Sequence, residues 1–187
     1  MIEKKNNNKV NRAVFLDRDG VINISDVING KPYAPKELDH FILYDDVVDS
    51  VKRLKQAGFL VIVVTNQPDV GNGKVKRDTV ESMHVLLVQS LPLDKINVCY
   101  HSQTDGCECR KPKPGMILNS AEEFNIDLSA SYIVGDRKSD IEAGEAAGCK
   151  TIFIERNYLE PAPVKPDIAC KSLTHAVNYI LEKNISS

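Results

Sequence analysis

Residues 13–21 read Ala-Val-Phe-Leu-Asp-Arg-Asp-Gly-Val, an apolar run that stops at two acids and a glycine. Four consecutive apolar residues are typical of a short strand that is buried on both faces. In an open parallel sheet, ligands bind beyond the carboxyl ends of the strands, where Asp17 and Asp19 would lie. Two neighbouring carboxylates repel each other, and a divalent cation usually offsets that cost. A polar turn is the plain alternative, since Asp and Gly are common turn residues, so motifs further along the chain must decide.

Length and composition exclude several classes of protein. A chain of 187 residues with net charge −2 fits one domain, and it offers no electrostatic argument for nucleic acid or an anionic membrane. No apolar run approaches the roughly 20 residues needed to span a bilayer. Residues 1–11 are polar and lack the apolar core of a signal peptide, so we expect a flexible tail. Five cysteines, three of them within residues 99–109, argue against a disulfide framework. We expect a cytoplasmic monomer whose single domain spans residues 1–187.

Apolar spacing predicts strands that alternate with helices. Phe59 to Val64 is a second buried strand, and Gln67 to Lys74 is rich in turn residues. Asp78 with Glu81, and Ser139 with Glu142, have the spacing of capping boxes that begin helices. The further strands are expected at 96–100, 132–134, 151–154 and 168–169, and the further helices at 46–57, 116–124 and 173–181. This alternation predicts an α/β fold with a mainly parallel sheet.

The segment from Ile22 to Tyr44 shows no sustained period and contains Asn29-Gly30 and two prolines. We expect a loop of about twenty residues there, long enough to be functional but too short for an independent cap domain.

Polar groups follow three of the predicted strands: Asp17 and Asp19 after the first, Thr65 at the end of the second, and Asp136 after the strand at 132–134. Each alone could be a turn or a helix cap. Because the carboxyl ends of parallel strands meet at one edge of a sheet, we expect these groups to converge there.

With these motifs in order from Val14 to Asp140, the chain resembles the haloacid dehalogenase superfamily of aspartyl phosphotransferases. The resemblance implies a Rossmann-like fold with helices on both faces of the sheet and no large cap domain. It makes Asp17 the nucleophile and Asp19 the general acid and base, and the second acid points to phosphate chemistry. Mg²⁺ would be bound by the carboxylates of Asp17 and Asp136 and by the backbone carbonyl of Asp19, since oxygen-only ligation suits this ion. Thr65, the amide of Asn66 and Lys111 would stabilise the charge of the phosphoryl group.

The stretch Arg110-Lys111-Pro112-Lys113-Pro114-Gly115 contains two lysines, and either could reach a phosphate. The family match favours Lys111 for the phosphoryl group and Arg110 for the rest of the substrate. Asp140 is expected to orient the lysine or the metal site, although a capping position would also explain it. Arg137 could contact substrate or only solvent.

Three thiols and one imidazole, Cys99, His101, Cys107 and Cys109, form a second constellation. They make a closed ligand set for a structural zinc ion that leaves no open position for catalysis, although incidental cysteines are the plain alternative. The zinc would hold Arg110 and Lys111 at the mouth of the site. Cys149 and Cys170 lie in apolar surroundings and are expected to be packing residues.

This zinc loop, with D-R-D-G-V, T-N-Q and C-R-K-P-x-P-G-M, resembles the heptose-bisphosphate phosphatase and histidinol-phosphatase group of the superfamily. The resemblance implies removal of the 7-phosphate of D-glycero-D-manno-heptose 1,7-bisphosphate, a step toward surface polysaccharide precursors, with Asn23, Asn66, Gln67, Arg110 and Arg137 contacting the substrate. Two features depart from the group: residues 68–73 lack its usual arginine, and the zinc loop is short. Histidinol phosphate is the alternative substrate, and a non-catalytic, zinc-stabilised interaction module is the alternative class.

Overall fold

The computed structural model describes residues 10–163 and 165–185. Its centre is a six-stranded sheet in the order β5-β4-β1-β6-β7-β8, in which every pairing is parallel. The strands are β1 (Ala13–Leu16), β4 (Leu60–Asn66), β5 (Lys95–Cys99), β6 (Tyr132–Gly135), β7 (Lys150–Ile154) and β8 (Ile168–Cys170). All strands predicted from the sequence are present.

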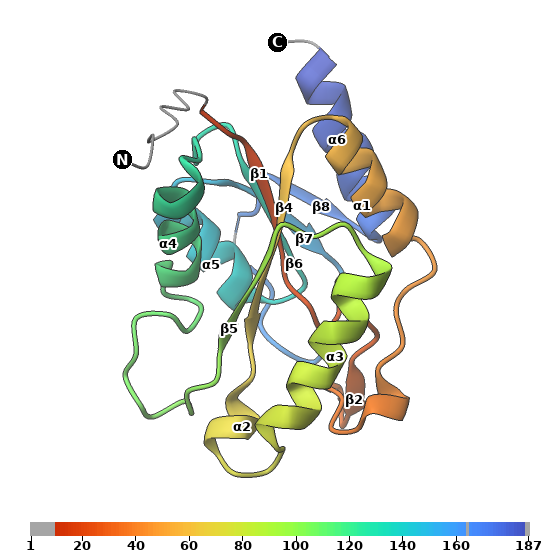
Figure 1. The fold of residues 1–187 in the computed structure, drawn as a ribbon, viewed down its shortest axis with the longest axis vertical. Helices are drawn as coiled ribbons and strands as arrows, with labels where there is room; N and C mark the ends of the chain where they lie inside the picture. The colour runs from red at the N-terminus through yellow and green to blue at the C-terminus, as the bar shows by residue number, and fades with distance from the viewer. Residues whose placement is uncertain (1–9, 164, 186–187) are drawn as a thin grey trace, which may run out of the picture.

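Helices cover both faces of this sheet (Figure 1). Val14 and Leu16 of β1 pack toward α1, α3 and α6, whereas Phe15 packs toward α4 and α5. The alternation of side chains along a strand therefore gives each face its own apolar core. The helices are α1 (Val47–Gln56), α2 (Pro68–Gly71), α3 (Arg77–Ser90), α4 (Gly115–Phe124), α5 (Lys138–Ala147) and α6 (Leu173–Ile185). The predicted α/β fold is confirmed.

Two predicted helix caps differ in the structure. Lys76 is the N-cap of α3, without a side-chain capping bond, so the expected box of Asp78 and Glu81 does not form. Arg137, not Ser139, is the N-cap of α5, and Oδ2 of Asp140 accepts the backbone N–H of Arg137 at 3.0 Å. The capping position that the sequence left open for Asp140 is therefore present in the structure.

The segment expected to be a plain loop contains an antiparallel hairpin, β2 (Asp26–Ile28) and β3 (Lys31–Tyr33), and the short 3-10 helix η1 (Leu38–His40). Asn29 and Gly30 both have positive φ, as a two-residue type I′ turn requires. The hairpin tip contacts a distant segment, because Leu159 donates its N–H to the carbonyl of Gly30 at 2.7 Å. Residues 155–163 and the hairpin are thereby joined beside the sheet edge.

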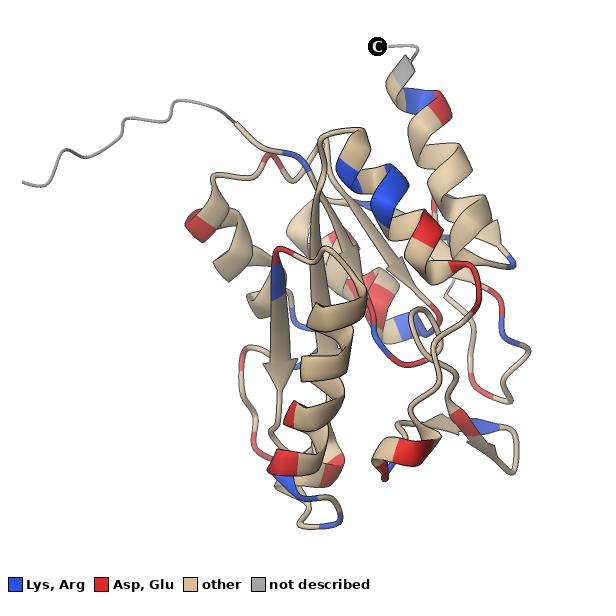
Figure 2. Cartoon of the chain, turned by 45° about the vertical axis from the view of Figure 1, so that its right-hand side comes forward, with Lys and Arg blue, Asp and Glu red and all other residues tan. Residues whose placement is uncertain are grey.

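Charged residues of both signs are interspersed over the helices and loops in Figure 2. In the part of the chain that the structure describes, no helix is long and apolar enough to cross a membrane. Most of the expected N-terminal tail lies outside the described residues. Asn11 is an exception, since its backbone N–H and its side-chain Nδ2 donate to the carbonyls of Asn125 and Phe124.

Candidate active site

The strand order brings the predicted residues to one edge of the sheet. Asp17 follows β1, Asn66 ends β4 on one side of β1, and Asp136 follows β6 on the other. A cavity of about 370 Å³ opens at this edge. Seven of the predicted residues line it: Asp17, Asp19, Asn66, Gln67, Arg110, Lys111 and Arg137.

Three buried carboxylates, those of Asp17, Asp136 and Asp140, lie with one oxygen each within 4.8 Å of one another. By distance and angle, neither oxygen of Asp136 has a hydrogen-bond partner among the described residues, although the nearby Tyr158 hydroxyl interacts with this carboxylate and lowers its pKa. Burial, with the nearby Asp140 carboxylate, raises the pKa of Asp17 to about 7. Burial and the Asp17 charge likewise raise the pKa of Asp136. A hard divalent cation with oxygen ligands would relieve both the repulsion and the missing bonds, so these residues fit Mg²⁺.

Gly20 makes room for this cluster. It has φ +88°, and a Cβ built on it would lie 1.7 Å from Oδ2 of Asp136. Any other residue would displace the Asp136 carboxylate, which explains the glycine that follows the two acids.

Lys111 is the buried cation that contacts the carboxylates of this site. Its buried Nζ lies 2.9 Å from Oδ1 of Asp17 and 2.7 Å from Oδ1 of Asp140, and it donates to the carbonyl of Val64 at 2.7 Å. Burial alone would lower the pKa of Lys111, but the Asp140 and Asp17 charges outweigh it and raise that pKa. Lys113 lies at the surface, where it pairs with Glu108 at 2.7 Å.

Asn66 holds the backbone of Lys111. Its Nδ2 donates to the carbonyl of Lys111 at 3.0 Å, and its Oδ1 accepts the Lys111 N–H at 3.1 Å. The side chain of Asn66, a residue expected to contact the substrate, therefore holds the lysine, and Asn66 also lines the cavity.

Asp19 is held by side chains on several sides. Arg18 donates to both of its oxygens, Asn23 donates to Oδ1 at 3.0 Å, and Gln67 donates to Oδ2 at 2.7 Å. Asn23 is fully buried and Thr65 lies behind Gln67, whose Nε2 donates to the Thr65 hydroxyl at 2.9 Å. Three predicted residues, Asn23, Thr65 and Asp136, are not among the described residues that line this cavity; Asp136 lines a second cavity with Arg137 and Tyr158. The side chains of Asn23 and Thr65 support Asp19 and Gln67.

The two arginines that line the cavity, Arg110 and Arg137, differ in their partners within the protein. Nη1 of Arg110 is buried without a hydrogen-bond partner among the described residues. Arg137 makes a two-pronged ion pair with Glu160, at 2.9 and 2.8 Å. Arg110 lines the cavity and makes no ion pair among the described residues, whereas Arg137 is committed to the 155–163 segment.

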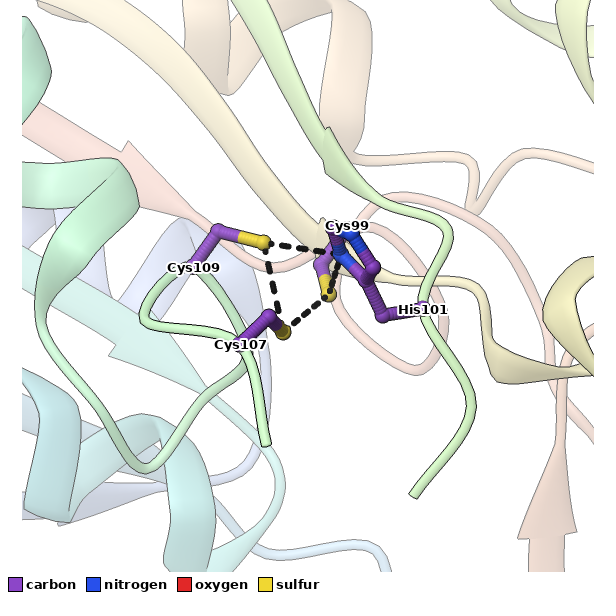
Figure 3. A group of neighbouring side chains, drawn as sticks. All are labelled: Cys99, His101, Cys107 and Cys109. Carbon is purple, nitrogen blue, oxygen red and sulfur yellow. Dashed lines mark hydrogen bonds between the residues drawn. The ribbon is translucent and has the colours of Figure 1, made fainter. Parts of the chain in front are cut away.

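The ligand atoms of Cys99, His101, Cys107 and Cys109 point toward one another (Figure 3). Cys99 Sγ lies 3.6 Å from both His101 Nδ1 and Cys107 Sγ, and Cys109 Sγ lies 3.3 Å from His101 Nδ1 and 3.5 Å from Cys107 Sγ. Tetrahedral ligation of zinc at ordinary bond lengths places such atoms about 3.5 to 3.8 Å apart. The four residues fit a closed zinc site.

Gly71 joins this cluster to α2. A Cβ at Gly71 would lie 2.5 Å from the backbone N of Ser102 and 2.6 Å from the carbonyl oxygen of Tyr100. The turn at 68–74 therefore rests directly on the backbone of the zinc loop.

Sequence comparison identifies curated relatives that match most of the chain. A D-glycero-beta-D-manno-heptose-1,7-bisphosphate 7-phosphatase of Escherichia coli K12 is 36% identical over 167 residues, which cover 83% of each chain. A protein of the same name from Pseudomonas aeruginosa is 37% identical over 147 residues, or 76% of this chain and 80% of the relative. The HAD-hydrolase-like family matches residues 108–176. The chain belongs to the haloacid dehalogenase superfamily.

Solved structures of the superfamily agree with this membership. A D,D-heptose 1,7-bisphosphate phosphatase from B. bronchiseptica, complexed with magnesium and phosphate, is 30% identical with a TM-score of 0.79. That match covers 92% of this chain and 99% of the other. The predicted enzyme class, a phosphoric monoester hydrolase, is confirmed.

Sequence reasoning overlooked two side chains of this haloacid dehalogenase site, Arg18 and His84. Arg18 was visible as the residue between the two acids, but nothing in the sequence placed its side chain inside. His84 lies on the inner face of α3 with Val80 and Leu87, where a histidine is usually a packing residue.

Proposed function

We propose that the protein is a magnesium-dependent phosphatase that forms an aspartyl-phosphate on Asp17 and removes the 7-phosphate of D-glycero-D-manno-heptose 1,7-bisphosphate. The observation that carries this proposal is the contact of Lys111 with both Asp17 and Asp140, next to the buried carboxylate of Asp136. A binding module would gain nothing from burying three carboxylates and a lysine at a cavity, because their desolvation is costly. The names of the relatives support the substrate.

In the first step, a carboxylate oxygen of Asp17 attacks phosphorus, and the bond from phosphorus to the sugar oxygen breaks. Asp19 gives its proton to that oxygen, so the sugar leaves as an alcohol. Oδ1 of Asp17 is fixed by the N–H of Arg18 at 2.7 Å and by Lys111, so the nucleophile is already oriented. Lys111 also places its charge where the phosphoryl oxygens would lie.

In the second step, water attacks the phosphorus of the aspartyl-phosphate. Asp19, now a carboxylate, takes the proton from this water, and the bond between phosphorus and Asp17 breaks to release inorganic phosphate. Asp17 returns to its starting state.

Asp17 and Asp136, with the backbone carbonyl of Asp19, would hold Mg²⁺, which neutralises the charge that builds up on the phosphoryl group. Cys99, His101, Cys107 and Cys109 would hold zinc in a structural role, which keeps the loop that carries Arg110 and Lys111 in place.

The choice of substrate rests on charge. A sugar bisphosphate presents a second anion, and the guanidinium group of Arg110, which lines the cavity, could bind it. Histidinol phosphate presents a cationic amine instead and would need a free carboxylate. Asp69, an acid that lines the cavity, lies 3.8 Å from Nζ of Lys74. That ion pair favours the bisphosphate.

The test is a comparison of kcat/KM on both heptose 1,7-bisphosphate anomers, fructose 1,6-bisphosphate and histidinol phosphate. We expect kcat/KM to be about tenfold or more higher for a heptose bisphosphate than for the other substrates, with loss of the 7-phosphate only. Arg110→Ala should cost about 1.5 to 3 kcal/mol of transition-state binding with the bisphosphate. Preference for histidinol phosphate, unchanged by that mutation, would assign the other substrate.

The variant Asp17→Asn tests whether the protein is an enzyme or a non-catalytic interaction module. An amide cannot form the aspartyl-phosphate, so this variant should bind Mg²⁺ weakly and turn over no substrate. Wild-type rates in Asp17→Asn would refute the mechanism, and a wild-type protein that releases phosphate from no ester would favour the module.

A further inference from the structure

The largest fully buried side chain in the described part of the chain is an arginine, Arg18, with no exposed surface. A guanidinium group is always charged, and burial without a partner would be strongly unfavourable. Arg18 lies between the proposed nucleophile and the proposed general acid. Its burial therefore calls for an explanation in terms of these two residues.

The guanidinium group of Arg18 binds the carboxylate of Asp19 through its Nε and Nη2 atoms. Nη2 donates to Oδ1 at 2.9 Å and to Oδ2 at 3.0 Å, and Nε lies 3.2 Å from Oδ1. The plane of the guanidinium fixes the direction of the carboxylate, because several parallel bonds leave no free rotation. Asp19 is nevertheless a lining residue of the cavity, so it is held where a substrate would meet it.

His84 of α3 fixes the other end of the guanidinium group. Nη1 of Arg18 lies 3.1 Å from Nε2 of His84. Because arginine can only donate, Nε2 must be the unprotonated nitrogen and Nδ1 must carry the hydrogen. Nδ1 lies 3.5 Å from Oε2 of Glu81, an acceptor that suits this tautomer. The ring of Phe41, with its centroid 5.3 Å from Cζ, covers the guanidinium face.

We propose that Arg18, set in place by His84, is a positioning residue that orients the Asp19 carboxyl group for both proton transfers. This inference rests on the proposed function, since it takes Asp19 as the general acid and base. Arg18 touches neither the reacting phosphorus nor the leaving oxygen, and it acts only through Asp19.

Leaving groups distinguish this role from a merely structural one. An alkyl phosphate needs a proton on its departing oxygen, whereas 4-nitrophenyl phosphate releases a stable phenolate without one. Arg18→Met should lower kcat about 30-fold or more with the best alkyl phosphate of the substrate panel, but about threefold or less with the aryl ester. Arg18→Lys keeps the positive charge but loses the paired hydrogen bonds of the guanidinium group. Its kcat for the alkyl phosphate should therefore lie between those of wild type and Arg18→Met.

The decisive measurement is a double-mutant cycle with Asp19→Asn. If Arg18 acts through Asp19, adding Arg18→Met to Asp19→Asn should change kcat for the alkyl phosphate by about twofold or less. A full loss in the Asp19→Asn background, or equal losses on alkyl and aryl esters, would overturn the proposal. Absence of turnover by wild type on every ester would instead refute the proposed function.

Arg12→Met is the matched control, since Arg12 precedes β1 and also stacks on a phenylalanine, with its Cζ 4.7 Å from the centroid of Phe59. It should leave the alkyl-to-aryl ratio unchanged. If Arg18→Met does not fold, His84 carries the test. His84→Leu should lower the alkyl rate several-fold more than the aryl rate, and His84→Gln, which retains an acceptor, should recover most of that loss. Equal effects of His84→Leu on both esters would overturn the proposal.

Discussion

The Nζ of Lys111 lies 2.7 Å from Oδ1 of Asp140, while the other oxygen of the same carboxylate caps the first turn of α5. One side chain therefore joins the lysine proposed to bind phosphate to the start of the helix that follows Asp136. The position of Lys111 depends on α5 as much as on its own loop.

Lys111→Met should abolish most of the activity and destabilise the protein. The variant would leave Asp17 and Asp140 buried without their cation, and breaking a buried ion pair costs about 3 to 5 kcal/mol of unfolding free energy. We expect kcat/KM to fall at least about 100-fold, the scale of losing one preorganised charge contact. Lys113→Met, which removes the exposed neighbour, should match wild type in urea unfolding and in steady-state kinetics. Similar losses in both variants would contradict the assignment.

Without a divalent ion, stability should fall as pH rises from about 4 to 7. The pKa of Asp17 rises from 3.8 to about 7 in the folded chain, mainly through burial. Between these values the folded protein keeps a proton that the unfolded chain has lost, so raising the pH favours unfolding. Melting temperatures in EDTA should show this decline, and Asp17→Asn should flatten it. Added Mg²⁺ should raise the melting temperature of wild type near pH 7. A decline of equal slope in Asp17→Asn would exclude Asp17 as its source.

Zinc should copurify at about one ion per chain, as expected for a closed structural site. Cys107→Ser should lower zinc content and melting temperature together, with activity falling only as the loop that carries Lys111 loosens. Cys170→Ser is the control, because its thiol bonds the carbonyl of Ser172, away from the cluster. Elemental analysis that finds no zinc in freshly purified protein would remove this claim and leave the magnesium chemistry intact.

Gly71→Ala should weaken substrate binding more than it slows turnover. The new Cβ would collide with backbone atoms of Tyr100 and Ser102, which cannot move aside as a flexible side chain would. We expect a cost of about 1 to 3 kcal/mol, typical of overpacking, together with a higher KM for the bisphosphate. Gly73→Ala is the comparison: its Cβ would meet nothing within 4 Å, although its φ of +68° adds strain. An unchanged KM in Gly71→Ala would show that the turn at 68–74 does not contribute to substrate binding.

Apolar periodicity and polar residues after strands predicted the sheet, the convergence of Asp17, Thr65 and Asp136, and the Cys/His group. These features depend on local pattern and on the geometry of parallel strands, which a sequence expresses directly. Lys111 was favoured over Lys113 by family likeness alone, since two lysines in one loop are equivalent until their burial is known.

The hydrogen-bond partners of Asn23 and Asn66 could not be predicted, because the partner of an amide depends on a distance of a few ångströms. The hairpin could have been predicted, since Asn29-Gly30 is a usual dipeptide for a type I′ turn. It was missed because three-residue strands carry too little alternation to stand out.

The bond between Leu159 and Gly30 gives this small enzyme an enclosure assembled from two parts of the chain that are far apart in sequence. Pro32 and Tyr33 of the hairpin and Glu160 of the 155–163 segment line the same cavity. Two segments that are joined by this hydrogen bond therefore form part of the cavity wall. Changes in hairpin length should consequently alter which phosphate esters are accepted, without any change in the residues that carry out the chemistry.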